Sequence, residues 1–164
     1  MTFNALALTL AGAVTLAQHT GQMHTKPDNH DALHARGAKT MGFDQSLAAH
    51  HFTLLADGGS IDIQVVDARD EVTRKKVAAH LDEIRAQFKS GNFGTPEATH
   101  AEMPDGTAAM ARLRDAIDYA VAPSARGAAL RITARTPEAL EAVHAFLRYQ
   151  IREHRTGDPL TIGR

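Results

Sequence analysis

Residues 51–66 read HFTLLADGGSIDIQVV, and this stretch decides the fold class. Two apolar runs flank the turn-forming Asp57-Gly58-Gly59, and residues 60–66 alternate between apolar and polar side chains. Alternation with a period of two is typical of a half-buried strand, and a glycine-rich turn between two such runs is typical of a β-hairpin. The sequence therefore predicts two antiparallel strands with one apolar and one polar face.

A second unit of the same kind follows in the chain. After the first hairpin, a helix is predicted from Asp70 to about Gly91, with apolar residues at helical spacing. Residues 117–121 and 130–134 alternate like strands, and Thr136-Pro137 begins a last helix, because Thr caps helices and Pro fits their first position. The order ββα, connector, ββα predicts an α+β fold, a four-stranded antiparallel sheet with two long helices on one face. The other face is expected to be polar, since it carries His51, Thr53, Asp62, Gln64, Asp118, Arg131 and Thr133.

The connector and the N-terminal segment have different characters. Residues 92–108 read NFGTPEATHAEMPDGTA, which lacks apolar periodicity and predicts a long loop before a short helix at about 109–114. Residues 5–17 are apolar and uncharged, but they are too few for a transmembrane helix, which needs about 20 residues. They fit the apolar region of a secretory signal. We therefore expect a signal peptide at 1–17, a flexible histidine-bearing tether at 18–40, a single α+β domain at 41–158 and a tail at 159–164.

Composition excludes several classes of function. Lys plus Arg number 18 and Asp plus Glu 19, so the formal net charge is −1 and there is no basic excess for nucleic-acid phosphates. The chain has no cysteine, which excludes disulfides, iron–sulfur clusters and thiolate zinc sites. No catalytic triad, phosphate loop or pair of catalytic carboxylates can be recognised, so no catalytic residue is predicted. Once the signal is cleaved, we expect no stable membrane insertion.

Histidine is the unusual feature of the composition, with ten residues in the chain. His50-His51 opens the first predicted strand, His144 lies in the buried stripe of the last helix, and His100 lies in the connector that crosses between the two halves. Metal sites are built from side chains of facing elements, so these positions predict a metal site. Adjacent strand residues point to opposite faces, and only one of the first pair should bind the metal directly. The predicted ligands are His50, His51, His100 and His144.

An all-imidazole set, with Met103 or a carboxylate as a further ligand, suits Cu(II) better than structural zinc, so copper is predicted and Zn(II) is the alternative. The first hypothesis is a periplasmic or secreted metal-binding protein for buffering, delivery or sensing. A second is an interaction module whose polar sheet face or long loop binds a partner protein, or a second copy as a homodimer. A third is an enzyme that uses a histidine-bound metal.

Five motifs of the sequence extend this picture. They are Arg36-Gly37, Met41-Gly42-Phe43-Asp44-Gln45, His50-His51-Phe52, Asp57-Gly58-Gly59 and the run AVHAFLRYQIREHRTGD at 142–158. Through them the chain resembles a family of small, signal-bearing bacterial proteins of unassigned function. Members of that family sometimes carry the name aspartate carbamoyltransferase, but the Ser-Thr-Arg-Thr helix start that binds carbamoyl phosphate is missing from this sequence. The resemblance implies one exported domain and supplies no mechanism.

Export gives a direct prediction. Cleavage after Ala17 leaves a mature chain that begins at Gln18, because Thr15 and Ala17 are the small residues that a signal peptidase recognises. Intact-mass measurement of the protein recovered from the periplasm should show the loss of residues 1–17. Recovery of the full-length chain from the cytoplasm would contradict export.

Overall fold

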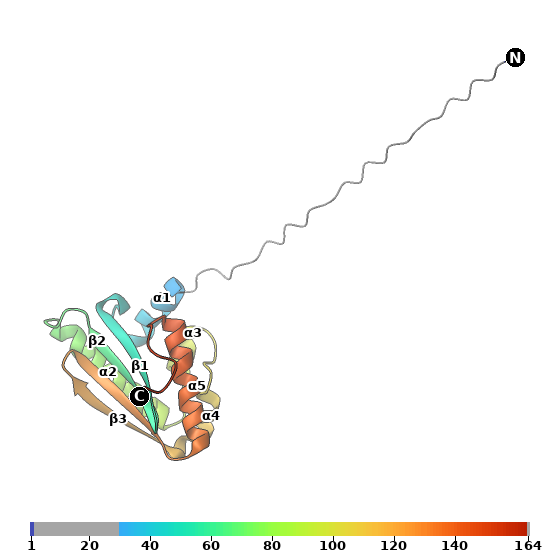
Figure 1. The fold of residues 1–164 in the computed structure, drawn as a ribbon. Coiled ribbons are helices and arrows are strands. Elements are labelled where there is room, and N and C mark those ends of the chain that lie inside the picture. Colours follow the sequence, from blue (N-terminus) through green and yellow to red (C-terminus); the bar gives the residue numbers. More distant parts are fainter. Residues whose placement is uncertain (2–29, 164) are drawn as a thin grey trace.

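A computed structural model describes residue 1 and residues 30–163 (Figure 1). The predicted signal peptide beyond residue 1 and the first part of the predicted tether lie outside the described residues. The elements follow in the order α1 (His30–Met41), η1 (Gln45–Leu47, a 3-10 turn), β1 (Ala48–Leu55), β2 (Gly58–Val65), α2 (Glu71–Lys89), α3 (Gly94–His100), α4 (Thr107–Arg112), η2 (Arg114–Ala116, a 3-10 turn), β3 (Ile117–Ser124), β4 (Gly127–Ala134) and α5 (Pro137–His154).

The four strands form one antiparallel sheet in the order β1-β2-β4-β3. The second strands of the two hairpins pair with each other in the middle, which leaves β1 and β3 as edges. In β2, Ile61, Ile63 and Val65 are buried, while Asp62 and Gln64 between them are partly exposed on the other face. The predicted α+β fold, with its four-stranded antiparallel sheet, is confirmed.

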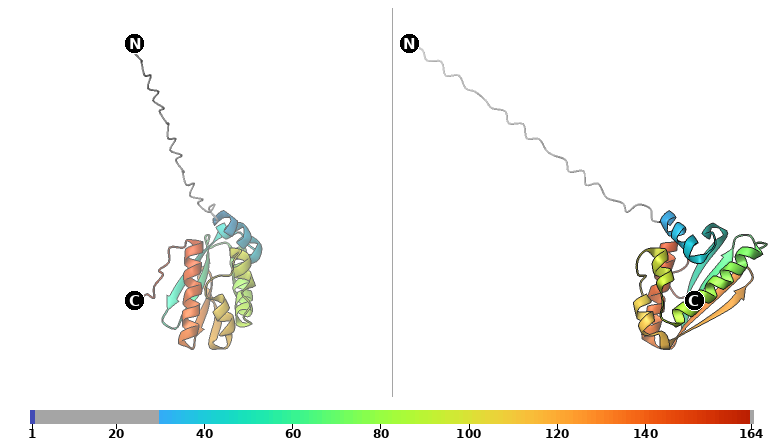
Figure 2. Two further views of the ribbon diagram at one scale, coloured as in Figure 1. Left: turned by 90° about the vertical axis from the view of Figure 1, so that its right-hand side faces the viewer. Right: turned by 180° about the vertical axis from the view of Figure 1, so that it is seen from behind.

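Helices α2 and α5 cover the same face of the sheet (Figure 2). The Asp70 side chain accepts a hydrogen bond from the backbone N–H of Thr73 at 2.9 Å, and Thr136 caps α5 in the same way. Capping oxygens satisfy N–H groups that have no partner within the helix, so both helices begin where the sequence predicts. Their buried stripes include Val77, Leu81, Val143 and Leu147.

The predicted turn glycines belong to a strand. The chain reverses at residues 56–57, and both Gly58 and Gly59 pair with β1 as part of β2. A Cβ on Gly59 would lie 2.2 Å from Leu147 Cδ1 and 2.4 Å from the carbonyl oxygen of Thr53. Glycine is therefore needed here for the close approach of α5 to the sheet. The tight turn predicted at Asp57-Gly58-Gly59 lies earlier in the chain, at residues 56–57. The sequence could not separate the two cases, because glycine is favoured both in tight turns and where a helix packs closely on a strand.

The connector is not the predicted long loop. Residues 94–100 form helix α3, which ends at Ala101 in the left-handed conformation with φ of 58°. Its sequence GTPEATH contains weak helix formers and no apolar period, so local propensity gives no signal. Packing supplies the stability instead, since Pro96 and Thr99 are buried and α3 lies against α1.

The second part of the predicted tether is also ordered structure. Helix α1 covers residues 30–41 and packs on α3. Leu33 is 3% exposed, Arg36 Nε donates to the Thr99 carbonyl oxygen at 2.8 Å, and the hydroxyls of Thr40 and Thr99 lie 2.8 Å apart. The domain therefore begins by His30, and the boundary predicted between residues 40 and 41 was wrong because a short polar helix with one buried leucine has little apolar pattern.

The C-terminal segment closes the free edge of β1. Asp158 Oδ2 accepts a hydrogen bond from the backbone N–H of Phe52 at 2.9 Å, and Arg148 Nε donates to the Leu160 carbonyl oxygen at 2.9 Å. An unpaired strand edge invites pairing with other chains, and this carboxylate occupies one of its donors. Within residues 30–163, no helix combines the length and the apolar character needed to cross a bilayer.

Replacement of Leu33 tests the place of α1 in the domain. Leu33→Ala should lower the free energy of unfolding by roughly 2–3 kcal/mol, because removal of a buried leucine side chain loses its transfer energy and leaves a cavity. Chemical denaturation followed by circular dichroism measures this, with Lys39→Ala on the exposed side of the same helix as the control. A free energy of unfolding equal to that of the wild type would mean that α1 is not docked.

Candidate functional site

The structure separates the four predicted metal ligands. His51 lies on the open face of the sheet with a side chain that is 47% exposed, and its Nδ1 is 3.3 Å from Asp158 Oδ1. His144 Nε2 lies 3.0 Å from the carbonyl oxygens of both Leu55 and Gly58. Carbonyl oxygens accept hydrogen bonds, so this Nε2–H ties α5 to the β1–β2 turn. Of the predicted set, His51 and His144 therefore make contacts elsewhere, while His50 and His100 line one cavity.

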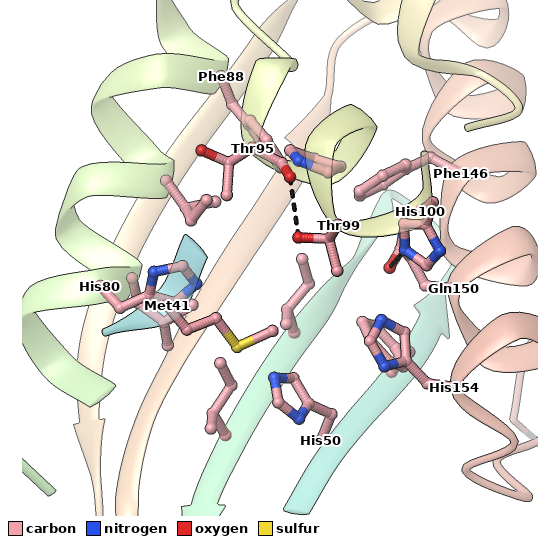
Figure 3. A pocket seen from close by; sticks show the side chains of 16 residues that line it. Met41, His50, His80, Phe88, Thr95, Thr99, His100, Phe146, Gln150 and His154 are labelled. Atoms are coloured by element: carbon pink, nitrogen blue, oxygen red, sulfur yellow. Dashed lines mark hydrogen bonds between the residues drawn. The ribbon is translucent and has the colours of Figure 1, made fainter. Parts of the chain in front are cut away.

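This cavity lies between the sheet and helices α2, α3 and α5, with the side chain of Met41 from α1 pointing into it (Figure 3). Its volume is about 60 Å³, and much of its wall is apolar, with Phe52, Phe88 and Phe146 among the lining residues. Volume on this scale holds a few waters or a bare ion, but not a large organic ligand. The polar residues that line it are His50, His80, Thr95, Thr99, His100, Gln150 and His154.

Three imidazole rings from three elements stand in sequence along one side of the cavity. The ring of His50 on β1 stacks on that of His154 in the last turn of α5, with centres 5.4 Å apart and an interplanar angle of 17°. The ring of His100, at the end of α3, meets His154 edge-on with centres 5.1 Å apart. His154 is therefore the middle member of the cluster, which we call the histidine cluster (His50, His100 and His154).

His50 is a neutral imidazole with an unused nitrogen. Its Nε2 is buried and has no hydrogen-bond partner in the described part of the chain. Burial, together with smaller contributions from His80, His34 and His51, lowers the pKa of His50 to about 4. At neutral pH the ring is uncharged, and a buried polar atom without a partner is a feature that native structures rarely retain without a reason.

The orientation of His100 is fixed by an amide. His100 is 5% exposed, and its Nε2 lies 3.1 Å from Gln150 Oε1. An amide oxygen only accepts, so Nε2 carries the proton and Nδ1 carries the lone pair. This Nδ1 is buried and unpartnered among the described residues, and burial lowers the pKa of His100 against the opposing effect of the Gln150 hydrogen bond. The ring is thus a neutral imidazole that presents a lone pair.

A surface groove gives access to the cluster. It has a volume of about 340 Å³, and it shares His50 and His154 with the cavity. His34 of α1 and Arg155, which follows α5 in the left-handed conformation with φ of 51°, also line it. His50 and His154 therefore lie between an outer groove and an inner cavity.

Two histidines that line the cavity are not among the predicted ligands. His154 fits the helix C-terminus as a partner of the helix dipole, and His80 fits a buried helix stripe, so each has an ordinary explanation from sequence alone. One signal was present. Phe146, Gln150 and His154 follow at intervals of four on α5, which places a polar amide on the buried face of a helix. A buried glutamine needs a partner, and here the partner is His100.

The rings do not form a ready coordination site in their present orientation. Among residues 30–163, no three histidine, aspartate or glutamate side chains converge in a metal-ligand arrangement. The chain matches no protein-family model, no curated protein and no solved structure. The family resemblance drawn from the sequence motifs therefore stays a prediction.

The depressed pKa of His50 predicts a specific pH dependence of the metal-free protein. The unfolded chain binds a proton at His50 below its ordinary pKa of 6.5, whereas the folded chain does so only near 4. Stability is therefore complete above pH 6.5 and falls as the pH decreases toward 4, by roughly 3 kcal/mol from this residue. Chemical denaturation at a series of pH values in the presence of a chelator should show a smaller loss for His50→Gln than for the wild type. Equal slopes for His50→Gln and the wild type would contradict the burial of a neutral His50.

Proposed function

We propose that this domain binds one transition-metal ion through the histidine cluster. The observation that carries the proposal is the spacing of the rings. A metal lies about 2 Å from each imidazole nitrogen, which places the ring centres of two tetrahedral ligands about 5 Å apart. In the structure the ring centres lie 5.4 Å apart for His50 and His154 and 5.1 Å apart for His154 and His100.

Binding needs rotation of rings but no movement of the backbone. Because the rings of His50 and His154 are nearly parallel, their nitrogen lone pairs do not converge on a common point where an ion could bind. Rotation about the terminal side-chain torsion of histidine is soft, because that torsion has broad minima. The spacing of the rings is fixed by the packing of β1, α3 and α5, whereas the direction of each ring can adapt to the ion.

The protonation states favour a metal over a proton. Metal binding needs neutral imidazole, and burial lowers the pKa of both His50 and His100. Gln150 holds the second nitrogen of His100, an arrangement that orients ligating histidines in many metal sites. Burial of neutral rings with unpaired nitrogens costs stability in the empty protein, and coordination of an ion satisfies both nitrogens.

The proposed role is reversible binding of copper or, alternatively, zinc in an exported protein, for buffering or delivery. Access through the groove suits exchange of the ion with solvent or with a donor molecule, because His50 and His154 face both spaces. The predicted signal peptide places this activity in the periplasm or outside the cell. The ligand set proposed here keeps His50 and His100 from the sequence prediction and replaces His51 and His144 with His154.

Calorimetric titration of the full chain with Cu(II) and Zn(II) tests the proposal. A weak competing chelator keeps exposed histidines empty, and one ion should bind per chain. His50→Gln and His100→Gln should each weaken binding by about 100-fold, because each removes a direct ligand and second-shell changes alone cost 10–100-fold.

The matched control is His51→Gln, an exposed histidine next to His50, which should bind as the wild type does. Thermal unfolding of the metal-free variants checks that they are folded. Unchanged affinity and stoichiometry in both cluster variants would contradict the proposed site.

A further inference from the structure

The charge of the cavity wall selects between ions, and this inference rests on the proposed metal function. Among the described residues that line the cavity, none is an aspartate, glutamate, lysine or arginine. An ion bound in this cavity therefore keeps its whole charge in an apolar surrounding.

The energetic cost of that burial depends steeply on the ion's charge. The solvation energy that an ion loses on transfer to an apolar medium grows with the square of its charge, and for a unit charge it already amounts to several kcal/mol after relaxation. A divalent ion thus loses about four times as much as a monovalent one of similar size. Divalent sites usually offset this loss with carboxylate or thiolate ligands, and this cavity offers neither.

A thioether lines the same cavity as the histidine cluster. The side chain of Met41, the last residue of α1, points into the cavity toward His50 (Figure 3). Two hydrogen bonds to Thr99 on α3 hold this end of α1, from Arg36 Nε to the carbonyl oxygen and between the hydroxyls of Thr40 and Thr99. Thioethers favour Cu(I) among the biological metals, and they contribute little to the binding of Zn(II) or Cu(II).

From the cavity lining without charged residues and from the position of the Met41 thioether, we infer that the ion of this site is Cu(I), bound by imidazoles of the histidine cluster together with Met41. Neutral ligands in an apolar cavity suit a monovalent, soft ion that needs few ligands and no bound water. The oxidation state therefore differs from the Cu(II) that the sequence alone predicts. Helix α1, expected to be part of a tether, supplies a ligand.

The test is an anaerobic titration of the full chain with Cu(I) against a chromophoric Cu(I) chelator, in parallel with Zn(II). The wild type should bind one Cu(I) with an affinity at least 100-fold above that for Zn(II). Met41→Leu keeps the volume of the side chain and removes the sulfur, and it should weaken Cu(I) binding about tenfold or more while leaving Zn(II) binding unchanged. The matched control is Met103→Leu, since Met103 is 54% exposed and lies outside the cavity.

A second measurement on the wild type makes the test independent of any variant. X-ray absorption at the copper edge should show sulfur among the ligands along with imidazole nitrogens. The Cu(I) assignment would be overturned by any of three results: Cu(I) affinity unchanged by Met41→Leu, no sulfur at the copper, or tighter binding of Zn(II) than of Cu(I). His50-dependent binding of Zn(II) or Cu(II) would still support the proposed metal function. If His50→Gln and His100→Gln both bind Cu(I) and the divalent ions as the wild type does, the metal site itself is overturned.

Discussion

The close approach of α5 to the β1–β2 hairpin is the interaction on which the rest of the structure depends. Gly59 has no Cβ, so Leu147 packs directly on the strand backbone, and His144 Nε2 bonds to the carbonyl oxygens of Leu55 and Gly58 one turn earlier on the same helix. Because buried carbonyl oxygens need hydrogen-bond donors, His144 stabilises the contact between α5 and the hairpin. The contact fixes the rotation of α5 and thereby places Gln150 and His154 over the sheet.

The cavity follows from how the remaining helices fill the layer. Helices α2 and α5 carry the apolar stripes, while α3 and α1 contribute Thr99, His100 and Met41 to the space between them. Protein interiors are close-packed, and in an ordinary core such a space is filled by apolar side chains such as leucine or phenylalanine. Here the space is lined by imidazoles with unpaired nitrogens at His50 and His100. Each unpaired buried nitrogen costs about 1–3 kcal/mol, so the arrangement lowers stability in the empty protein, as sites for ligands often do.

Elements with strong local patterns were predictable from the sequence. The hairpins alternate with a period of two, and α2 and α5 combine capping residues with apolar stripes, so their positions follow from local rules. Helices α1 and α3 have weak local signals because their stability comes from contacts with each other, and their sequences, HDALHARGAKTM and GTPEATH, contain few apolar residues. Tertiary packing overrides weak propensity in both.

The site was half predictable for the same reason. Strand alternation correctly separates His50 from His51, but it cannot say which residue faces His50 across the layer. That depends on the rotation of α5, which turns His144 toward the hairpin carbonyls and His154 toward His50 and His100. Ten residues separate these two histidines on one helix, and at 100° per residue they point in clearly different directions.

Helix α1 links the proposed ion to the fold. Its last residue, Met41, lines the cavity, and its docking rests on Leu33 and on the hydrogen bonds to Thr99. If the ion binds Met41 only when α1 is docked, binding must stabilise the docked helix by the same free energy by which docking increases the affinity. The weak, polar character of α1 is then compatible with function, because a helix held by few contacts can open the cavity at small cost. A strongly apolar helix at this position would close the cavity permanently and would prevent exchange of the ion.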